Sequence, residues 1–140
     1  MLVSRELNAA YRALRIAFGL GTSVAGLDKF ANVLTDWEKY LGPGVLQTLP
    51  INAMTFMHGV GYIEIVVGLA ILFGASRTFG YLAMLWLWAI AVNLIYAGIY
   101  YDIAVRDIIL GAAAFALAKV TEARRSVLYL ENRDATRPAA

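Results

Sequence analysis

The chain has 140 residues, of which 61% are hydrophobic and 16% are charged, and its mean hydropathy is +0.65. This composition excludes an ordinary soluble domain, in which about half of the residues are apolar. The formal charge is only +2 and the basic residues lie near the ends of apolar segments, so we predict no nucleic-acid-binding surface. The chain contains no cysteine, which excludes a disulfide, a thiolate nucleophile and a cysteine-ligated iron–sulfur or zinc site within it.

Apolar segments dominate the sequence, and their lengths approach the roughly 20 residues that a helix needs to cross a bilayer. We therefore predict an all-α fold, an integral membrane four-helix bundle formed by one domain over residues 1–125, with a flexible tail over residues 126–140. The predicted spans are residues 12–30, 54–73, 79–100 and 103–118. Charges, a Gly-Pro-Gly turn and Pro50 predict a loop over residues 32–52, in which Trp37 and Tyr40 suit a position at the membrane interface.

The Lys and Arg residues are distributed unevenly between the two predicted sides of the membrane. Nine of the twelve fall on the side of the termini, namely Arg5, Arg12, Arg15, Arg77, Lys119, Arg124, Arg125, Arg133 and Arg137. Because cytoplasmic segments carry the excess of basic residues, we predict that both termini are cytoplasmic.

Glu64 lies near the middle of the second predicted span. An ionised side chain at that depth costs about 2.5–3.5 kcal/mol to insert, so Glu64 is a candidate functional residue. It shares a helix face with Gly61 and Gly68, which admit the close approach of another helix, and we expect its side chain to point into the bundle. Two roles stay open, a polar link between helices and a ligand-binding or proton-carrying group. A paired carboxylate and a neutral carboxylic acid are both compatible with this position.

His58 and Asn93 are two further polar residues inside the predicted spans. His58 lies six residues from Glu64, which puts it on a different side of the same helix, so we expect no direct pair. His58 either donates to a quinone-like carbonyl or carries a proton, or it makes a hydrogen bond between helices. Asn93 shares one face of the third span with Trp86 and Ile90, where either a flat apolar ligand or ordinary packing is expected. One histidine with scattered carboxylates lacks a metal-ligand spacing, so we predict no metal site.

Charged residues gather at the ends of the first and fourth spans that lie opposite the termini: Asp28, Lys29, Asp102, Arg106 and Asp107. The spacing of four predicts a local pair between Asp102 and Arg106. Lys29 is then available to Asp107, and Asp28 to Arg106, which predicts an ionic clasp between the two spans. The alternative role of these residues is anchoring of the helix ends and folding specificity.

Glycines recur along the first two spans, in the stretch GLGTSVAG and at Gly59, Gly61 and Gly68. No strand is predicted before them, so a phosphate-binding loop is excluded. We predict that these glycines are helix-contact positions.

Three stretches, RIAFGLGTSVAGLDKF, EIVVGLAILFGASRTFGYLAML and YYDIAVRDIILGAAAFALA, resemble the DoxX family of small four-span membrane proteins. The resemblance covers nearly all of the chain between Arg12 and Ala118. It implies a four-helix bundle in a prokaryotic cytoplasmic membrane, and a link to thiosulfate:quinone oxidoreduction or to membrane complexes that join sulfur metabolism and oxidative defence. The family pattern maps onto Gly26, Lys29, Glu64, Gly68, Arg106 and Asp107.

From these features and the resemblance we expect a small subunit of a quinone-linked redox assembly, in which Glu64, His58 and Asn93 bind or protonate a quinone head group. Without cysteine, a bound quinone or a partner subunit must carry the electrons. A catalytic role would make the chain part of a quinone-dependent oxidoreductase rather than a stand-alone enzyme, with membrane lipid and other membrane or redox subunits as partners. Two alternatives stay open, a noncatalytic structural or assembly subunit of a larger membrane complex and a carrier of a small molecule or lipid.

Overall fold

The computed structural model describes residues 2–48 and 50–135, and within these ranges the chain is helical and contains no strand. The elements in order are α1 (Leu2–Ala31), η1 (Trp37–Tyr40), α2 (Pro43–Thr48), α3 (Ala53–Leu72), α4 (Ser76–Ala97) and α5 (Tyr101–Ala135). The all-α prediction is therefore confirmed.

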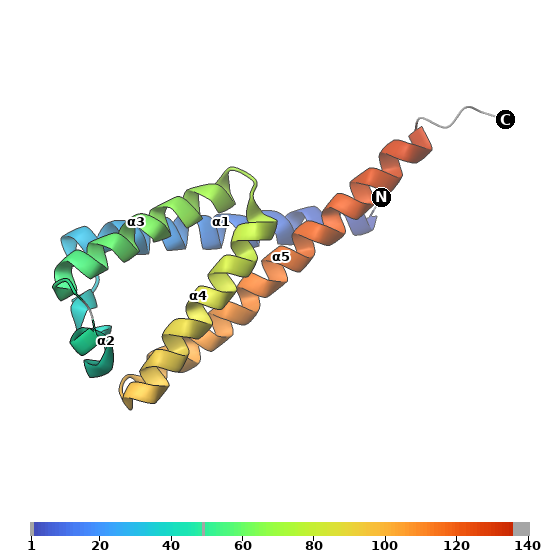
Figure 1. Ribbon diagram of the computed structural model, residues 1–140. Coiled ribbons are helices and arrows are strands. Elements are labelled where there is room, and N and C mark those ends of the chain that lie inside the picture. Colours follow the sequence, from blue (N-terminus) through green and yellow to red (C-terminus); the bar gives the residue numbers. More distant parts are fainter. Residues whose placement is uncertain (1, 49, 136–140) are drawn as a thin grey trace.

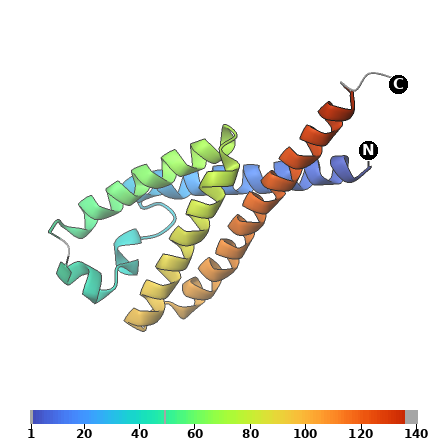
Figure 2. The same ribbon diagram turned by 45° about the vertical axis from the view of Figure 1, so that its right-hand side comes forward.

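The long helices form two antiparallel pairs (Figures 1 and 2). α1 lies along α3, and α4 lies along α5. The pairs meet near the turn between α3 and α4, where Tyr11, Ile71 and Leu117 form a buried apolar cluster. From there the pairs diverge, and η1 and α2 lie at the wide end (Figure 2). The four long helices therefore form two pairs inclined to each other, whereas the sequence predicted one four-helix bundle.

Glycine allows α1 and α3 to pack with their backbones in contact. A Cβ atom on Gly26 would lie 2.6 Å from the carbonyl oxygen of Gly61, and a Cβ atom on Gly68 would lie 2.6 Å from that of Gly19. Such distances leave no room for a side chain, so the prediction that Gly26, Gly61 and Gly68 are contact positions is confirmed.

Two of the predicted contact glycines pack differently. A Cβ atom on Gly21 or Gly59 would meet nothing within 4 Å. The prediction is wrong for these two because they face away from the α1–α3 contact. Gly21 lies along the space between the helix pairs instead.

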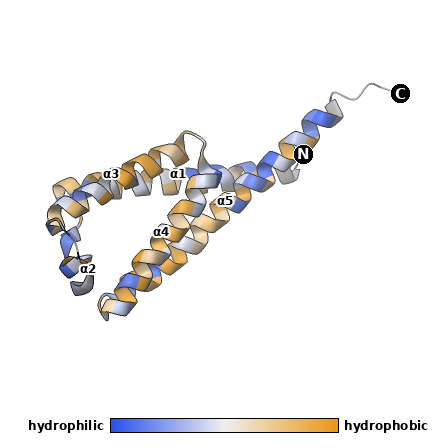
Figure 3. Cartoon of the chain, viewed as in Figure 1, coloured by the Kyte–Doolittle hydropathy of each residue, from blue (hydrophilic) through white to orange (hydrophobic). Residues whose placement is uncertain are grey.

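Two helices, α3 and α4, are long and apolar enough to cross a membrane. Figure 3 shows apolar residues along both of them and polar residues concentrated in the C-terminal part of α5. α1 and α5 are longer, but each carries charged residues inside its apolar stretch, such as Lys29 and Asp107. The four predicted spans fall within α1, α3, α4 and α5, except that the second and third spans were predicted to extend beyond the C-terminal ends of α3 and α4.

Two boundaries differ from the predictions. The predicted loop over residues 32–52 contains two short helices, because Asp36 caps the start of η1 through the backbone N–H of Glu38 and Pro43 begins α2. At the other end, α5 is continuous to Ala135, so residues 126–135 of the predicted tail are helical. The rest of that tail, residues 136–140, lies outside the described residues.

Candidate ligand-binding site

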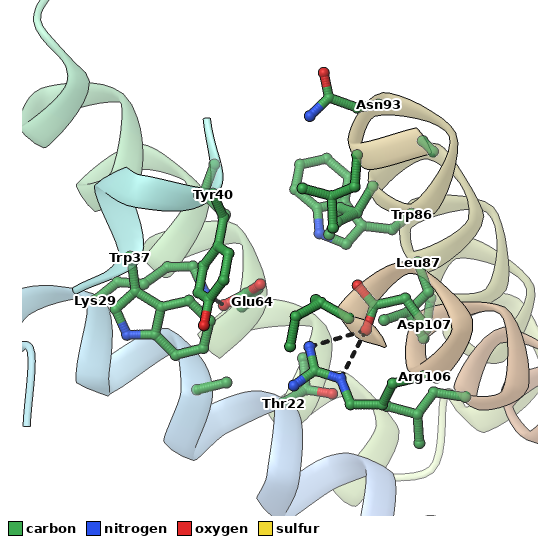
Figure 4. A pocket seen from close by; sticks show the side chains of 18 of the residues that line it. Thr22, Lys29, Trp37, Tyr40, Glu64, Trp86, Leu87, Asn93, Arg106 and Asp107 are labelled. Carbon is green, nitrogen blue, oxygen red and sulfur yellow. Dashed lines mark hydrogen bonds and ion pairs between the residues drawn. The ribbon is translucent and has the colours of Figure 1, made fainter. Parts of the chain in front are cut away.

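A cavity of about 630 Å³ lies between the two helix pairs, within the ~300–1,000 Å³ range of sites for small molecules. α1 and α3 line one side, α4 and α5 line the other, and η1 with the start of α2 closes the wide end. Most of the wall is apolar. The charged residues on it are Lys29, Glu64, Arg106 and Asp107, whose formal charges balance (Figure 4).

Lys29 and Glu64 form an ion pair on the α1–α3 side of the cavity. Lys29 Nζ lies 2.6 Å from Glu64 Oε2, and the two side chains are 4% and 12% exposed. Gly26 and Gly61 meet between these two residues, because a Cβ atom on Gly26 would lie 3.0 Å from Glu64 Cβ and one on Gly61 would lie 3.2 Å from Lys29 Cβ. The two long side chains therefore reach toward each other across the glycine contact. Glu64 thus points inward, as the glycine face predicted, and it has a cationic partner.

Trp37 covers the ion pair from the η1 end. Its ring centroid lies 3.7 Å from Lys29 Nζ, and its indole Nε1 donates to Asp28 Oδ2 at 2.7 Å. Asp28 also accepts from the backbone N–H groups of Val33 and Leu34. Asp28 therefore ties the segment after α1 to the end of that helix, and it does not form the predicted pair with Arg106. The carboxylate oxygens of Asp28 instead accept hydrogen bonds from backbone N–H groups that follow the end of α1 and have no helical partner.

Arg106 and Asp107 form the second ion pair, on the α4–α5 side. Arg106 Nε lies 3.0 Å from Asp107 Oδ1, and the Asp107 side chain is 2% exposed whereas that of Arg106 is 55% exposed. The Asp107 charge interacts with both Lys29 and Glu64 across the cavity. The predicted direct pair of Lys29 with Asp107 is wrong because Lys29 pairs with Glu64 instead.

The α4 wall of the cavity contains Trp86, Ile90 and Asn93, the predicted stripe for a flat ligand (Figure 4). The Trp86 side chain interacts with the Glu64 carboxylate. The amide of Asn93 is half-buried and makes no hydrogen bond within the described part of the chain. It therefore offers the cavity two donors and an acceptor that no protein group uses.

Three of the site residues named from the sequence do not line the cavity: Asp28, His58 and Asp102. His58, on α3, stacks on Phe30 of α1 with ring centroids 4.8 Å apart. Asp102 is exposed at the start of α5 and makes no ion pair in residues 2–48 and 50–135. The predicted pair with Arg106 is wrong because the Arg106 guanidinium turns toward its neighbour Asp107.

Other lining residues were not singled out as site residues by the sequence. Trp37 and Tyr40 were assigned to the membrane interface, and here they also form the end wall, where Tyr40 packs edge-on against Tyr100 at 4.9 Å. Thr22 contributes a hydroxyl to the α1 wall. Thr22 lies four residues before Gly26 and therefore near the face of α1 that packs inward. This spacing is the sequence feature that could have identified Thr22 as a site residue.

No group of three or more His, Asp or Glu side chains suited to a metal ion occurs among residues 2–48 and 50–135. No family model, curated protein or solved structure matches this sequence.

Proposed function

We propose that the chain is a small four-span, DoxX-like membrane protein that binds a quinone head group in this cavity, as the small subunit of a quinone-linked redox assembly. The observation that carries the proposal is a largely apolar cavity that holds charged groups of zero net formal charge beside the unused amide of Asn93. Ligand sites characteristically combine such walls with a few convergent polar groups.

Exposed apolar side chains support four spans rather than two. On α1 they recur every three or four residues, at Ile16, Leu20, Val24 and Leu27, each more than half exposed. On α5 they include Val105, Ile108 and Ile109. A continuous apolar face of this kind favours contact with lipid. In a four-span arrangement, Lys29, Arg106 and Asp107 face the cavity and these apolar residues face the hydrocarbon.

The basic residues support an orientation with both termini in the cytoplasm. Near the α3–α4 turn, Arg15 Nε donates to the Leu72 carbonyl oxygen at 2.9 Å and Arg77 pairs with Glu122 at 2.9 Å. α5 has 35 residues, about 52 Å at 1.5 Å per residue, which exceeds a hydrocarbon core of about 30 Å. Its basic C-terminal part therefore extends beyond the membrane on the same side.

The balanced charges favour a neutral ligand. An anion or a cation would leave one charge of a buried pair uncompensated, which is costly in a low-dielectric site. A quinone is neutral, flat and apolar, and its two carbonyl oxygens accept hydrogen bonds. The Asn93 amide and the Lys29 ammonium are donors at the cavity wall, and Trp86 supplies a flat apolar surface. The chain contains no cysteine, so a partner subunit with its own redox centre supplies or removes the electrons.

The test is quinone titration of the purified chain in nanodiscs. Asn93→Leu and Glu64→Gln are expected to weaken quinone binding by roughly tenfold or more, because the first removes the amide that faces the ligand and the second removes the carboxylate charge that holds Lys29 in place. Glu6→Gln is the control, since Glu6 is exposed on α1 outside the cavity. Unchanged affinity in both cavity variants would overturn the proposed site.

Mass spectrometry of the gently solubilised native assembly tests the partner. A co-purifying redox subunit with stoichiometric quinone supports the proposal. A large partner complex with no quinone on this chain would favour a structural subunit instead. Ligand-dependent flux through the isolated chain in proteoliposomes would favour a carrier.

A further inference from the structure

The contact between α1 and α5 carries arginines that the quinone site does not use (Figures 1 and 2). Arg124 of α5 donates from Nε to Asn8 Oδ1 of α1 at 2.5 Å, and its Cζ lies 4.8 Å from the ring centroid of Tyr11. Arg124 is half-buried, so these two contacts hold its guanidinium group against α1. Its two terminal nitrogens make no hydrogen bond within residues 2–48 and 50–135.

Two further arginines lie beside this contact on α1. Arg5 and Arg12 are one turn before and one turn after Asn8, and steps of three and four residues return to the same face of a helix. Both are exposed, and neither forms an ion pair in the described part of the chain. Glu122, an acidic residue near this end of α5, already pairs with two other basic side chains. Three arginines from two helices thus lie around one amide without an anionic partner among the described residues.

This cluster lies at the level of the lipid head groups in the proposed four-span arrangement. The series of exposed apolar residues on α1 begins at Ile16, and Arg12 precedes it by four residues, about 6 Å along the helix. The polar layer on each side of the hydrocarbon core is roughly 5–8 Å thick. The arginine side chains therefore reach the phosphates of the cytoplasmic leaflet, which contains the acidic lipids.

We propose that the phosphate of an acidic phospholipid binds among Arg5, Arg12 and Arg124, and that it links α1 to α5 where the two helix pairs meet. Guanidinium groups bind phosphate oxygens through paired N–H donors, so arginine suits this contact better than lysine does. None of the three residues lines the cavity. The inference rests on the membrane arrangement of the proposed function and adds a lipid site apart from the quinone site.

Native mass spectrometry of the full chain in detergent measures the binding of phosphatidylglycerol and of phosphatidylcholine. We expect wild type to bind phosphatidylglycerol at least about tenfold more tightly, because several arginines meet its net negative charge. Arg124→Gln and the double variant Arg5→Gln/Arg12→Gln should each weaken that binding by about fivefold or more. The double variant changes only exposed side chains, so it tests the site independently of any effect of Arg124→Gln on folding.

Arg125→Gln is the matched control. Arg125 is exposed at the next position of α5, about 100° around the helix from Arg124, and it forms no ion pair in residues 2–48 and 50–135. The substitution removes the same charge at the same depth but on another face. Its affinity for phosphatidylglycerol should therefore stay within about twofold of wild type.

The other results would overturn the inference. An equal loss in Arg125→Gln would show a general attraction of the basic surface rather than a site. Displacement of the lipid by inorganic phosphate would make a free phosphate the ligand. Equal binding of the two lipids to wild type would remove the acidic lipid altogether. The quinone proposal is tested separately, because none of these variants alters a cavity residue and their quinone affinity should equal that of wild type.

Discussion

Lys29 interacts with groups from several elements around the cavity. Its ammonium group pairs with Glu64, lies over the ring of Trp37 and interacts with the charge of Asp107. Only 4% of its side chain is exposed, so it has little access to water. A buried charge of this kind persists only while its partners remain, because desolvation of one unpaired charge costs several kcal/mol.

We therefore expect Lys29→Met to lower the free energy of unfolding by about 3–5 kcal/mol, since it leaves the Glu64 carboxylate buried without its partner. The double variant Lys29→Met/Glu64→Leu should recover most of that loss, because two apolar residues replace the pair. Unfolding of each variant in mixed micelles by SDS titration measures the difference. Lys39→Met, at an exposed residue of η1, is the control. A double variant as unstable as the single one would show that the pair does not act as a unit.

Glu122 predicts a pH dependence at the opposite end of the molecule. Hydrogen bonds from Lys119 at 2.6 Å and from Arg77 at 2.9 Å lower the pKa of Glu122 from its ordinary 4.5 to about 2. Because the pKa is lower in the folded state, this stabilisation is complete above about pH 4.5 and is lost as the pH falls toward 2. The difference in melting temperature between wild type and Glu122→Gln should narrow over that interval and shrink in high salt. A difference that stays constant between pH 6 and pH 2 would contradict this account.

At the scale of elements, the α1–α3 contact determines where Lys29 and Glu64 meet. Gly26→Ala is expected to destabilise the protein by about 1–3 kcal/mol, because the new Cβ atom would lie 2.6 Å from the Gly61 carbonyl oxygen and 2.9 Å from the Ile65 nitrogen. Gly59→Ala should be neutral or stabilising by up to about 1 kcal/mol, since alanine is the better helix former and has open space there. Thermal unfolding in detergent compares the two. Equal effects at both positions would argue against close packing of α1 on α3.

The helices themselves were largely predictable from the sequence. The apolar segment over residues 54–73 and its charge-free flanks predicted α3 (Ala53–Leu72) to within one residue at each end. Residues 32–52 were predicted as a loop from their charges, the Gly-Pro-Gly turn and Pro50, whereas in the structure Asp36 caps η1 and Pro43 is the first residue of α2. Helices of four and six residues carry too little periodicity to be recognised from their apolar pattern.

The site was predictable only in part. The inward direction of Glu64 followed from the glycines on its face, and Trp86, Ile90 and Asn93 were grouped correctly on one side of α4. The identity of each ionic partner was not predictable, because it depends on the register between helices that are far apart in the sequence. Lys29 and Glu64 are 35 positions apart in the sequence, and no pattern in the residues between them encodes their contact.

At the scale of the whole molecule, the proposed four-span arrangement predicts which segments face each side of the membrane. Because the chain has no cysteine, a single introduced cysteine is the only thiol in the protein that a maleimide can label. Gln47→Cys, in α2, should react with a membrane-impermeant maleimide on intact bacterial spheroplasts. Arg125→Cys, in the basic part of α5, should react only after permeabilisation. Labelling of both positions from the outside would contradict the arrangement.

We propose that a quinone occupies the cavity between the two helix pairs. Photolabelling of the membrane-embedded chain with a photoreactive quinone, followed by mapping of the modified residues by mass spectrometry, tests this occupancy. We predict that the label attaches to cavity residues such as Thr22 and Trp86, and that unlabelled quinone prevents it. Labelling confined to outward-facing residues such as Val92 and Tyr96, with no competition by unlabelled quinone, would contradict the claim.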